Sequence, residues 1–510
     1  MQSGDSVASQ NDLYEKNEQE KLSFWTKFVY GSGDLGTAIS AALRGFFLVF
    51  FLTDVARINP VWVGALFFSN RAWDAINDPV VGWLSDKTYT RWGRRRPWLL
   101  FGAVPFGLAY VALWYVPPFG QTGLLLYYFL VLLILDTTYT VVNVPYTSLT
   151  PELTRDSDER TSLNSYRFAF SVGGALISAV LHPIIVGSFD SARTGYIVSG
   201  AVWATLGTIT ILLVFLFTRE RPESMAERPT RDSMPYMQQV RTAISNRPYQ
   251  FVVALYLFSW LALQLLSVVL VFYATYYMRI PADYYKIGAV TLPPMSAVLL
   301  AVQGTSLIFI FIWSWVAHRL EKRTVYIIGA ALWLVVLLFL SFITPDMRAY
   351  VLPLGMLAGA GVAVAYLIPW SMMADVMEVD EWNTGLRREG IFYGFMVFLQ
   401  KISIAIAGFL VTWSLARTGY ITPTDEVLAP IQPDSALWAI RLFIGPVPAI
   451  ILVASIVVAV YYPITRAGHA ELVERLDERR AEEMETAPPG AGPSMIDAEE
   501  ASTATLLNRA

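Results

Sequence analysis

Three charged residues lie within a long apolar stretch of the chain, at a spacing that suits cation binding. Arg71, Asp74 and Asp78 recur at intervals of three and four residues, so a helix places them on one face. An ionised side chain near a bilayer centre costs at least about 2.5 kcal/mol and therefore faces a partner, a cavity or an ion. Pro79 cannot donate to the carbonyl of Ala75, which leaves an oxygen free beside the carboxylates. Such a site suits a monovalent cation or a proton.

Other apolar stretches also carry polar groups. One of them holds Asp136, Tyr139, Thr140 and Asn143, and the last two are three residues apart, so both can reach one ion. Further charges inside apolar stretches are Asp34, Arg44, Asp54, Arg167 and Lys401. Pairing between helices is the simpler explanation for any one of these charges. Small residues, however, can pack membrane helices together without the free-energy cost of burying charges. We therefore expect this set of charged residues as a whole to serve transport.

The elements that position these residues are membrane-spanning helices. The chain has 510 residues, of which 55% are hydrophobic and 15% charged. Apolar runs of about 20 residues recur along it, a pattern that the core of a soluble protein does not show. We predict an all-α membrane protein with twelve transmembrane helices, at residues 25–53, 61–84, 97–116, 122–149, 163–188, 196–218, 248–277, 290–317, 323–343, 349–376, 389–417 and 436–462.

A polar, proline-containing linker divides these helices six and six. The predicted division is an N-terminal segment at 1–23, a six-helix bundle at 24–218, a linker at 219–247, a second bundle at 248–465, and a charged helix with a disordered tail at 466–510. Lys and Arg concentrate in the loops on one side, which predicts that the linker and both termini are cytoplasmic. The polar start predicts no cleaved signal peptide, and we expect a plasma membrane location, the inner membrane in a bacterium.

Several classes of site and activity are not expected. The chain has no cysteine, which excludes disulfides and thiol chemistry, and its three histidines, His182, His318 and His469, are too scattered in sequence to suggest a metal cluster. The glycines from Gly31 to Gly36 spell a dinucleotide-binding pattern, but no strand precedes them, so close helix packing explains them better. We find no catalytic motif and expect no enzyme, no cofactor and no nucleic-acid partner, and a monomer.

Three motifs resemble one known family. They are Trp73-Asp-Ala-Ile-Asn-Asp-Pro79 with Gly82-Trp83, the loop Arg91-Trp-Gly-Arg94 with Pro97-Trp98, and Ala374-Asp375 leading to Arg387, Glu389 and Lys401. Together they resemble the glycoside-pentoside-hexuronide:cation symporters, the melibiose-permease-like branch of the major facilitator superfamily, over residues 24–465. The resemblance implies the major facilitator fold and transport of a sugar with a cation.

The resemblance also implies roles for individual residues. The cation ligands would be Asp74, Asp78, Thr140 and Asn143, with Na+ possible at the two carboxylates. Charge at Asp54 and Arg71 would matter for transport, while Arg167 would contact the sugar and Lys401 would lie between sugar and cation. The full predicted substrate set is Arg44, Asp136, Tyr139, Thr147, Arg167, Trp370 and Lys401, although packing is the simpler role for Tyr139 and Trp370. The predicted coupling and gating set is Asp54, Arg71, Asp86, Arg94, Asp375, Arg387 and Glu389.

This chain departs from the melibiose carriers at three positions of that pattern. Ala38 stands where they have a sugar-binding Asp, Asn143 where they have an acidic residue, and Thr147 where they have a stacking Trp. It offers Arg44 and Asp136 instead. These two either form an ion pair between helices or, in a sharper hypothesis, Arg44 joins Arg167 in binding a carboxylate of an acidic substrate.

The predicted function is therefore cation-coupled symport, with Na+ or H+, of a sugar, glycoside or acidic sugar by alternating access. Two carboxylates with neutral oxygens favour Na+ slightly. A lysophospholipid transporter of the same fold is the alternative, and a membrane-embedded enzyme or receptor is the alternative from another class. The loop with Asp86 and Arg94 is either a topology signal or a gate.

Overall fold

A computed structural model describes residues 21–154, 156–221, 244–287, 290–385, 389–424, 427 and 429–486. Most of the predicted linker, the tail after Thr486 and the predicted gating residue Arg387 lie outside the described residues. The backbone of Arg71 and of Glu389 is described, but their side chains are not.

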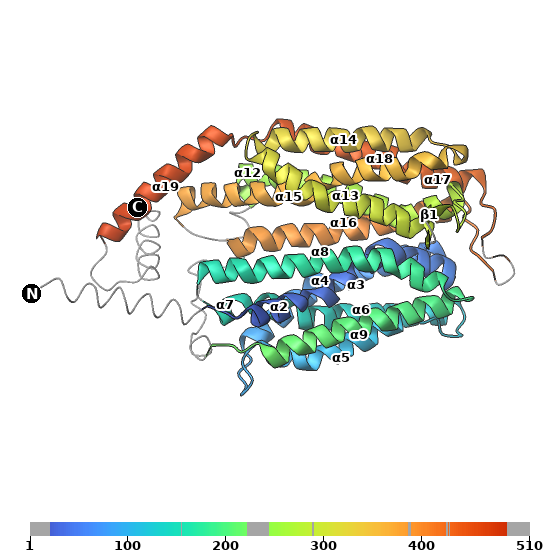
Figure 1. Cartoon of the computed structure of the whole chain (residues 1–510), viewed down its shortest axis with the longest axis horizontal. Helices are drawn as coiled ribbons and strands as arrows, with labels where there is room; N and C mark the ends of the chain where they lie inside the picture. Colours follow the sequence, from blue (N-terminus) through green and yellow to red (C-terminus); the bar gives the residue numbers. More distant parts are fainter. Residues whose placement is uncertain are drawn as a thin grey trace, which may run out of the picture. The chain divides into compact units, whose positions relative to one another are not determined.

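The chain forms two compact units (Figure 1). The first contains the described residues of 1–228 with Leu270–Leu300 and Gly408–Ile440. Its elements are α2 (Phe24–Ser32), α3 (Asp34–Phe50), η1 (Phe51–Val55), α4 (Pro60–Asp86), α5 (Arg96–Leu113), α6 (Gln121–Thr147), α7 (Thr150–Leu153), α8 (Ser157–Gly187), α9 (Ala192–Phe217), η2 (Tyr273–Tyr277), β1 (Tyr285–Ile287) and β2 (Val290–Leu292).

The second unit contains the described residues of 229–269, Ala301–Ala407 and those of 441–510. Its elements, some of which extend into the first unit, are α12 (Arg247–Phe272), α13 (Pro294–Ala317), α14 (Lys322–Phe342), η3 (Pro345–Tyr350), α15 (Val351–Thr384), α16 (Glu389–Arg417), α17 (Asp434–Ile444), α18 (Pro446–Val460) and α19 (Arg466–Thr486). The last of these is the charged C-terminal helix that the sequence predicts.

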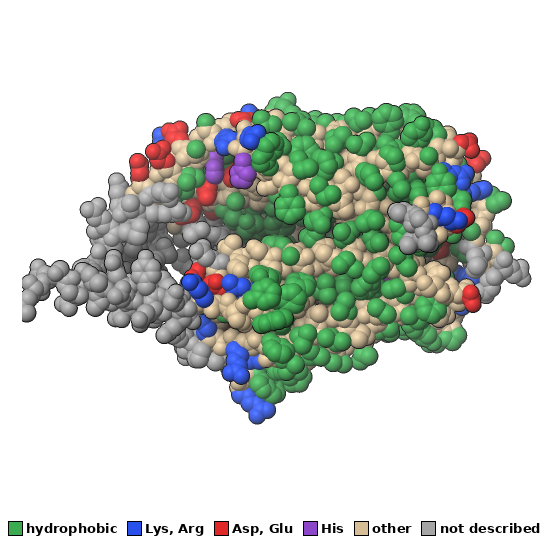
Figure 2. Space-filling view, viewed as in Figure 1, with side chains coloured by type: hydrophobic (Ala, Val, Ile, Leu, Met, Phe, Trp, Pro, Cys, Tyr) green, Lys and Arg blue, Asp and Glu red, His purple; other side chains and the backbone are tan. Residues whose placement is uncertain are grey.

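Eleven helical segments of the described chain are long and apolar enough to cross a membrane. The second predicted span, at 61–84, corresponds to α4, a helix of 27 residues that carries the charged stripe and is not among the eleven. Figure 2 shows hydrophobic side chains over the flanks of the helices, with acidic and basic side chains towards their ends. This distribution is the one that a bilayer requires, because its core offers no water to polar groups.

The start of α4 is fixed by local chemistry. The side chain of Asn59 accepts a hydrogen bond of 3.0 Å from the backbone N–H of Val61, and Pro60 occupies the first helical position. Both features favour a helix N-terminus. The helix continues past Pro79, as the sequence analysis expected, and ends at Asp86.

The predicted eighth span begins too early. Residues 290–292 form strand β2, which pairs antiparallel with β1, and α13 begins only at Pro294. The physical reason is the pair Pro293-Pro294, because the residue before a proline is pushed out of the α-helical region. The valine and threonine before it favour a strand.

Helices of the first unit approach one another closely where glycines meet. A Cβ added to Gly36 on α3 would lie 2.7 Å from the Cα of Gly207 on α9, so neither position accepts a side chain without displacement. The glycines of the dinucleotide-like pattern thus include one that serves helix packing, as expected. Helix α3 also packs against α8, and α4 packs against α6, which sets the geometry of the candidate site (Figure 1).

Candidate functional site

Helices α4 and α6 bring three of the four predicted cation ligands into one region. The hydroxyl of Thr140 donates a hydrogen bond of 2.8 Å to Oδ1 of Asp78. Asp74 lies one helical turn before Asp78 and is buried, with 4% of its surface exposed. Asn143, the fourth predicted ligand, lies nearly one turn beyond Thr140, is half-buried, and makes no side-chain hydrogen bond with any described residue. Its amide oxygen is therefore available to a ligand.

A buried ion pair lies beside these carboxylates. The Arg44 guanidinium on α3 is 2.5 Å from Oδ1 of Asp136 on α6, and the two side chains are only 11% and 2% exposed. The Asn70 amide of α4 donates to the other carboxylate oxygen, and the Asn77 amide donates to the Asp136 backbone carbonyl at 3.2 Å. The simpler of the two accounts of Arg44 and Asp136, an ion pair between helices, therefore describes this conformation. A role in substrate binding stays a prediction.

The charges of this region leave room for one cation. Counted from the sequence, Asp74, Asp78 and Asp136 supply three negative charges, and Arg44 and Arg71 supply two positive ones, of which only the Arg44 side chain is described. One monovalent cation or one proton would balance the set. The cost of an unbalanced charge in a membrane interior makes that neutralisation favourable.

Tyr139 lies beside the Arg44 side chain of this ion pair. The Arg44 guanidinium lies over its ring, 5.5 Å from the ring centroid, and the ring of Phe106 is 6.2 Å away. Arg44, Asp34, Asp136 and Asp78 all lie close enough to act electrostatically on the phenol. Tyr139 thus combines packing with a position among the charged groups that the sequence analysis assigned to substrate and cation.

Arg167 on α8 is held by a carboxylate of α3. Its guanidinium is 3.5 Å from Asp34 and lies 5.0 Å from the ring centroid of Tyr146, while its buried Nε has no hydrogen-bond partner. The hydroxyl of Thr147, also predicted for substrate, donates to the carbonyl of Val144 in its own helix at 3.0 Å. Arg167 therefore keeps an unused donor, whereas Thr147 is satisfied locally.

The other two predicted substrate residues belong to the second unit. Trp370 on α15 stacks on Tyr393 of α16, with ring centroids 5.6 Å apart and planes 17° apart, and Tyr256 meets it edge-on. Lys401 is half-buried on α16. Trp370 thus packs against other aromatic rings, which is the simpler of its two predicted roles. A stacked aromatic pair also suits contact with a sugar ring.

A cluster of hydroxyl groups surrounds Asp54 in η1. Its carboxylate accepts hydrogen bonds from Thr53 at 2.5 Å, from Tyr420 at 2.7 Å and from Tyr276 of η2. Burial, together with the Asp54 carboxylate, raises the pKa of Tyr420 well above its usual value, so this phenol remains a donor. Among the described residues, no basic side chain pairs with Asp54.

Three other residues of the predicted gating set, Asp86, Arg94 and Asp375, take part in two charged clusters, one in each unit. In the first, Asp86 pairs with Arg95 and lies 4.0 Å from Arg94. Glu220 accepts hydrogen bonds from the backbone N–H groups of Arg94, Arg95 and Arg96 at 2.6, 2.8 and 2.9 Å, and so caps the start of α5. In the second, Lys322 lies 2.6 Å from Asp375.

Several partners were not assigned from the sequence. Asn70 and Asn77 share the face of α4 with the acidic stripe, and their spacing from Asp74 was the available signal. Tyr276 and Tyr420 lie 222 and 366 positions from Asp54, so no local pattern identifies them. Glu220, at the boundary of the linker, was likewise missed.

Comparison with known proteins gives clear matches. A family model described as MFS/sugar transport protein matches residues 29–466. An uncharacterized symporter of Synechocystis is 37% identical, over 90% of this chain and 98% of the relative. The inner membrane symporter YicJ of Escherichia coli is 30% identical, over 90% and 96% respectively. The sodium-dependent lysophosphatidylcholine symporter 1-A of Danio rerio is 27% identical, over 93% of each chain.

Solved structures also match. The nucleoside transporter NupG aligns with a TM-score of 0.57 at 13% identity, covering 85% of this chain and 98% of NupG. A bacterial homologue of the human peptide transporters PepT1 and PepT2 aligns with a TM-score of 0.57 at 15% identity, covering 89% and 100%. At this level of identity the likeness concerns the fold alone, and it confirms the predicted architecture.

Proposed function

This chain belongs to the MFS/sugar transport protein family and is a cation-coupled symporter of the major facilitator fold, and we propose that Asp74, Asp78, Thr140 and Asn143 bind its coupling cation. The hydrogen bond of 2.8 Å between Thr140 and Asp78 carries this proposal, because it joins the acidic stripe to the hydroxyl expected to complete the site. Carboxylate, hydroxyl and amide oxygens suit a hard monovalent cation. We propose Na+ as that cation.

The proposed substrate is a sugar, a glycoside or an acidic sugar. Support comes from Arg44 and Asp136 beside Tyr139, and from Arg167 beside Asp34 and Tyr146, which offer charged groups for hydroxyl or carboxylate recognition. Arg44 would exchange part of its pairing with Asp136 for a substrate carboxylate, since guanidinium groups bind carboxylates in a bidentate manner. The Nε of Arg167, which is buried and unpartnered, is a further donor for such a group.

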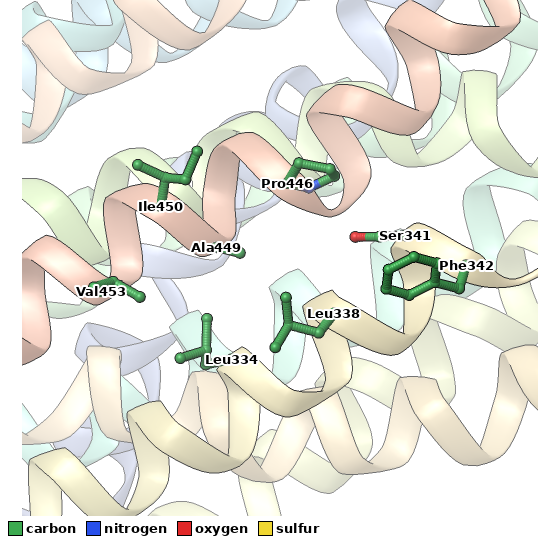
Figure 3. A pocket seen from close by; sticks show the side chains of 8 residues that line it. All are labelled: Leu334, Leu338, Ser341, Phe342, Pro446, Ala449, Ile450 and Val453. Atoms are coloured by element: carbon green, nitrogen blue, oxygen red, sulfur yellow. The ribbon is translucent and has the colours of Figure 1, made fainter.

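A lysophospholipid is an equally supported second candidate. The relatives named as sodium-dependent lysophosphatidylcholine symporters support it, as does an apolar groove in the second unit (Figure 3). This groove lies between α14 and α18, has a volume of about 460 Å³, and is lined by Leu334, Leu338, Ser341, Phe342, Pro446, Ala449, Ile450 and Val453. Such a lining suits an acyl chain and offers a sugar only the hydroxyl of Ser341.

In the proposed mechanism, the cation neutralises the stripe of α4 and draws α4 and α6 together. The cation thereby raises the affinity for substrate, and by linkage the substrate raises the affinity for the cation equally. The hydroxyl cluster around Asp54 would hold one end of α3 and η2 together until the conformation changes. Transport then follows by alternating access.

A thermal-shift screen tests the proposal. The purified chain is heated with mono-, di- and acidic sugars and with lysophosphatidylcholine, each in NaCl and in choline chloride. Stabilisation by a sugar that grows with Na+ supports the first candidate, and Na+-dependent stabilisation by the lipid alone replaces it with the second. Proteoliposomes that accumulate the identified solute under a pH gradient without Na+ would overturn the choice of Na+.

A further inference from the structure

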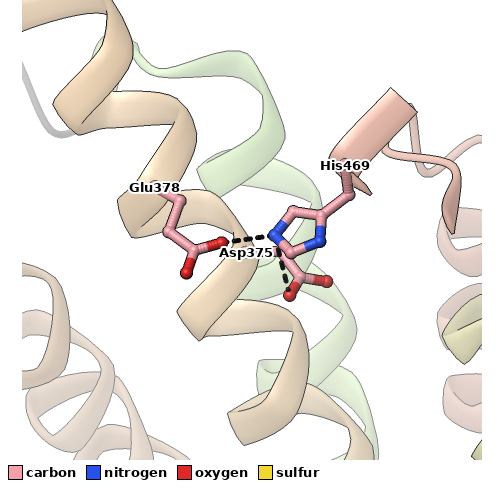
Figure 4. A group of neighbouring side chains, drawn as sticks. All are labelled: Asp375, Glu378 and His469. Atoms are coloured by element: carbon pink, nitrogen blue, oxygen red, sulfur yellow. Dashed lines mark hydrogen bonds and ion pairs between the residues drawn. The ribbon is translucent and has the colours of Figure 1, made fainter. Parts of the chain in front are cut away.

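A histidine and two carboxylates meet where α19 packs against α15 in the second unit (Figure 4). The Nε2 of His469 lies 2.5 Å from Oε2 of Glu378 and 3.4 Å from Oδ1 of Asp375. The three atoms that could act as ligands all lie within 4.8 Å of one another. Figure 4 shows the imidazole of α19 pointing between the two carboxylates of α15. None of the proposed cation or substrate ligands belongs to this group.

The backbone fixes this arrangement. Asp375 and Glu378 are three residues apart on α15, so they share one face, and His469 comes from the first turn of α19. Two carboxylates on one face repel each other unless positive charge lies between them. Lys322 supplies one positive charge at 2.6 Å from Asp375, and it also donates to the carbonyl of Ser371 at 3.0 Å. With a neutral imidazole, one negative charge remains.

We propose that His469, Glu378 and Asp375 bind a divalent transition-metal ion of the Zn²⁺ class. Imidazole nitrogen with carboxylate oxygen is a ligand set for such ions, whereas Ca²⁺ and Mg²⁺ prefer oxygen alone. Zinc sits about 2.0–2.2 Å from these ligands, so the ligand atoms of a tetrahedral site lie roughly 3.3 Å apart. The separation of 3.4 Å between His469 and Asp375 already fits, whereas Glu378 would move about 1 Å away from His469 to admit the metal.

The surroundings complete the site. The side chain of Asp375 is only 8% exposed and is oriented by Lys322, as a metal-binding carboxylate commonly is by a second hydrogen-bonding partner. The side chains of His469 and Glu378 are 24% and 39% exposed, so water can reach the open coordination position. Bound metal would fasten the C-terminal helix to α15.

Titration calorimetry of the full chain with ZnCl₂ tests the proposal. The chain is purified without a polyhistidine tag, and the native protein is expected to bind one Zn²⁺ per chain. His469→Ala and Glu378→Gln are each expected to weaken binding at least tenfold. His318→Gln and Glu471→Gln are matched controls, since they remove an exposed histidine and an exposed carboxylate outside the group, and they should leave the affinity unchanged.

A second measurement separates metal binding from a simple proton-dependent contact. The chain has no native cysteine, so Ala470→Cys on α19 can carry a single nitroxide label. Zn²⁺ is expected to restrict the label in the native background and not with His469→Ala. Equal Zn²⁺ binding by the native chain and His469→Ala would overturn the proposal, as would a label that responds to pH but not to Zn²⁺. Unchanged melting temperatures of the metal-free variants would show that they fold.

Discussion

The hydroxyl of Thr140 on α6 donates a hydrogen bond of 2.8 Å to the carboxylate of Asp78 on α4. This contact joins two helices within the apolar part of the first unit, next to the buried Asp74. A hydroxyl that already faces a carboxylate can turn its lone pairs towards a cation bound between them. The contact is therefore the structural basis of the proposed cation site.

Replacing Thr140 by valine should weaken Na+ binding by at least tenfold. Thr140→Val keeps the shape of the side chain but removes the hydroxyl, and a hydrogen bond to a charged group contributes about 1.5–3 kcal/mol. Thr138→Val is the matched control, because that hydroxyl bonds only to carbonyls of its own helix. Calorimetric titration with NaCl measures the Na+ affinity of both variants. Equal affinities of Thr140→Val and the control would contradict the assignment of Thr140 as a cation ligand.

The ion pair between Arg44 and Asp136 should show strong coupling in a double-mutant cycle. Removing one partner leaves a buried charge uncompensated, so Arg44→Gln and Asp136→Asn are each expected to destabilise the chain by about 3–5 kcal/mol. The double variant should recover much of that loss. Denaturation in detergent measures the free energy of unfolding of each variant. The exposed pair of Glu471 and Arg475 is the control, and its removal should change that free energy little. Additive losses at Arg44 and Asp136 would contradict a direct pair.

Substrate binding by the same double variant separates the two accounts of Arg44. If the pair is only structural, the folded double variant should bind the solute found in the thermal-shift screen as the native chain does. If Arg44 recognises a substrate carboxylate, as we propose for an acidic substrate, binding should fall at least tenfold while stability recovers.

Tyr420→Phe should loosen the two short helices η1 and η2. The change removes one of the three hydroxyl donors to Asp54, and a buried acceptor that loses a donor costs about 1–3 kcal/mol. Hydrogen–deuterium exchange should therefore rise in η1 and η2, not only near residue 420. Tyr461→Phe is the control, because Tyr461 is 69% exposed. An increase limited to the neighbours of Tyr420 would mean that the hydroxyl cluster does not tie the segments together.

Glu220→Gln should destabilise the start of α5. The carboxylate accepts three backbone N–H groups at 2.6–2.9 Å, and the amide provides only one acceptor oxygen and no charge for the helix N-terminus. We expect a loss of about 1–2 kcal/mol and faster exchange at Arg94 to Arg96. Exchange that is unchanged in this loop would contradict the capping role. Glu471→Gln again serves as an exposed control.

The sequence predicted the fold well because a bilayer imposes length and polarity on each helix. The resemblance to a known family also implied that Asp78 and Thr140 belong to one cation site, and their side chains are in contact. The prediction was wrong at residues 290–292 because a short apolar strand and the start of a helix are alike in hydropathy, and the pair Pro293-Pro294 delays the helix.

The partners missed from the sequence are those that only tertiary contact reveals. Tyr276 and Tyr420 reach Asp54 from segments hundreds of residues away. His469 is one of three histidines scattered in the sequence, yet folding places it within hydrogen-bond distance of Glu378, 91 positions away. Periodicity predicts which residues share a helix face, but it does not predict which faces meet.

Uptake into proteoliposomes tests the central claim most directly, with the solute that the thermal-shift screen identifies and with a Na+ gradient or a pH gradient imposed in turn. The native chain is expected to accumulate the solute under one of the gradients, Asp78→Asn only to equilibrate it, and the exposed control Asp190→Asn to behave as the native chain does. Concentrative uptake by Asp78→Asn equal to that of the native chain would contradict cation coupling through α4.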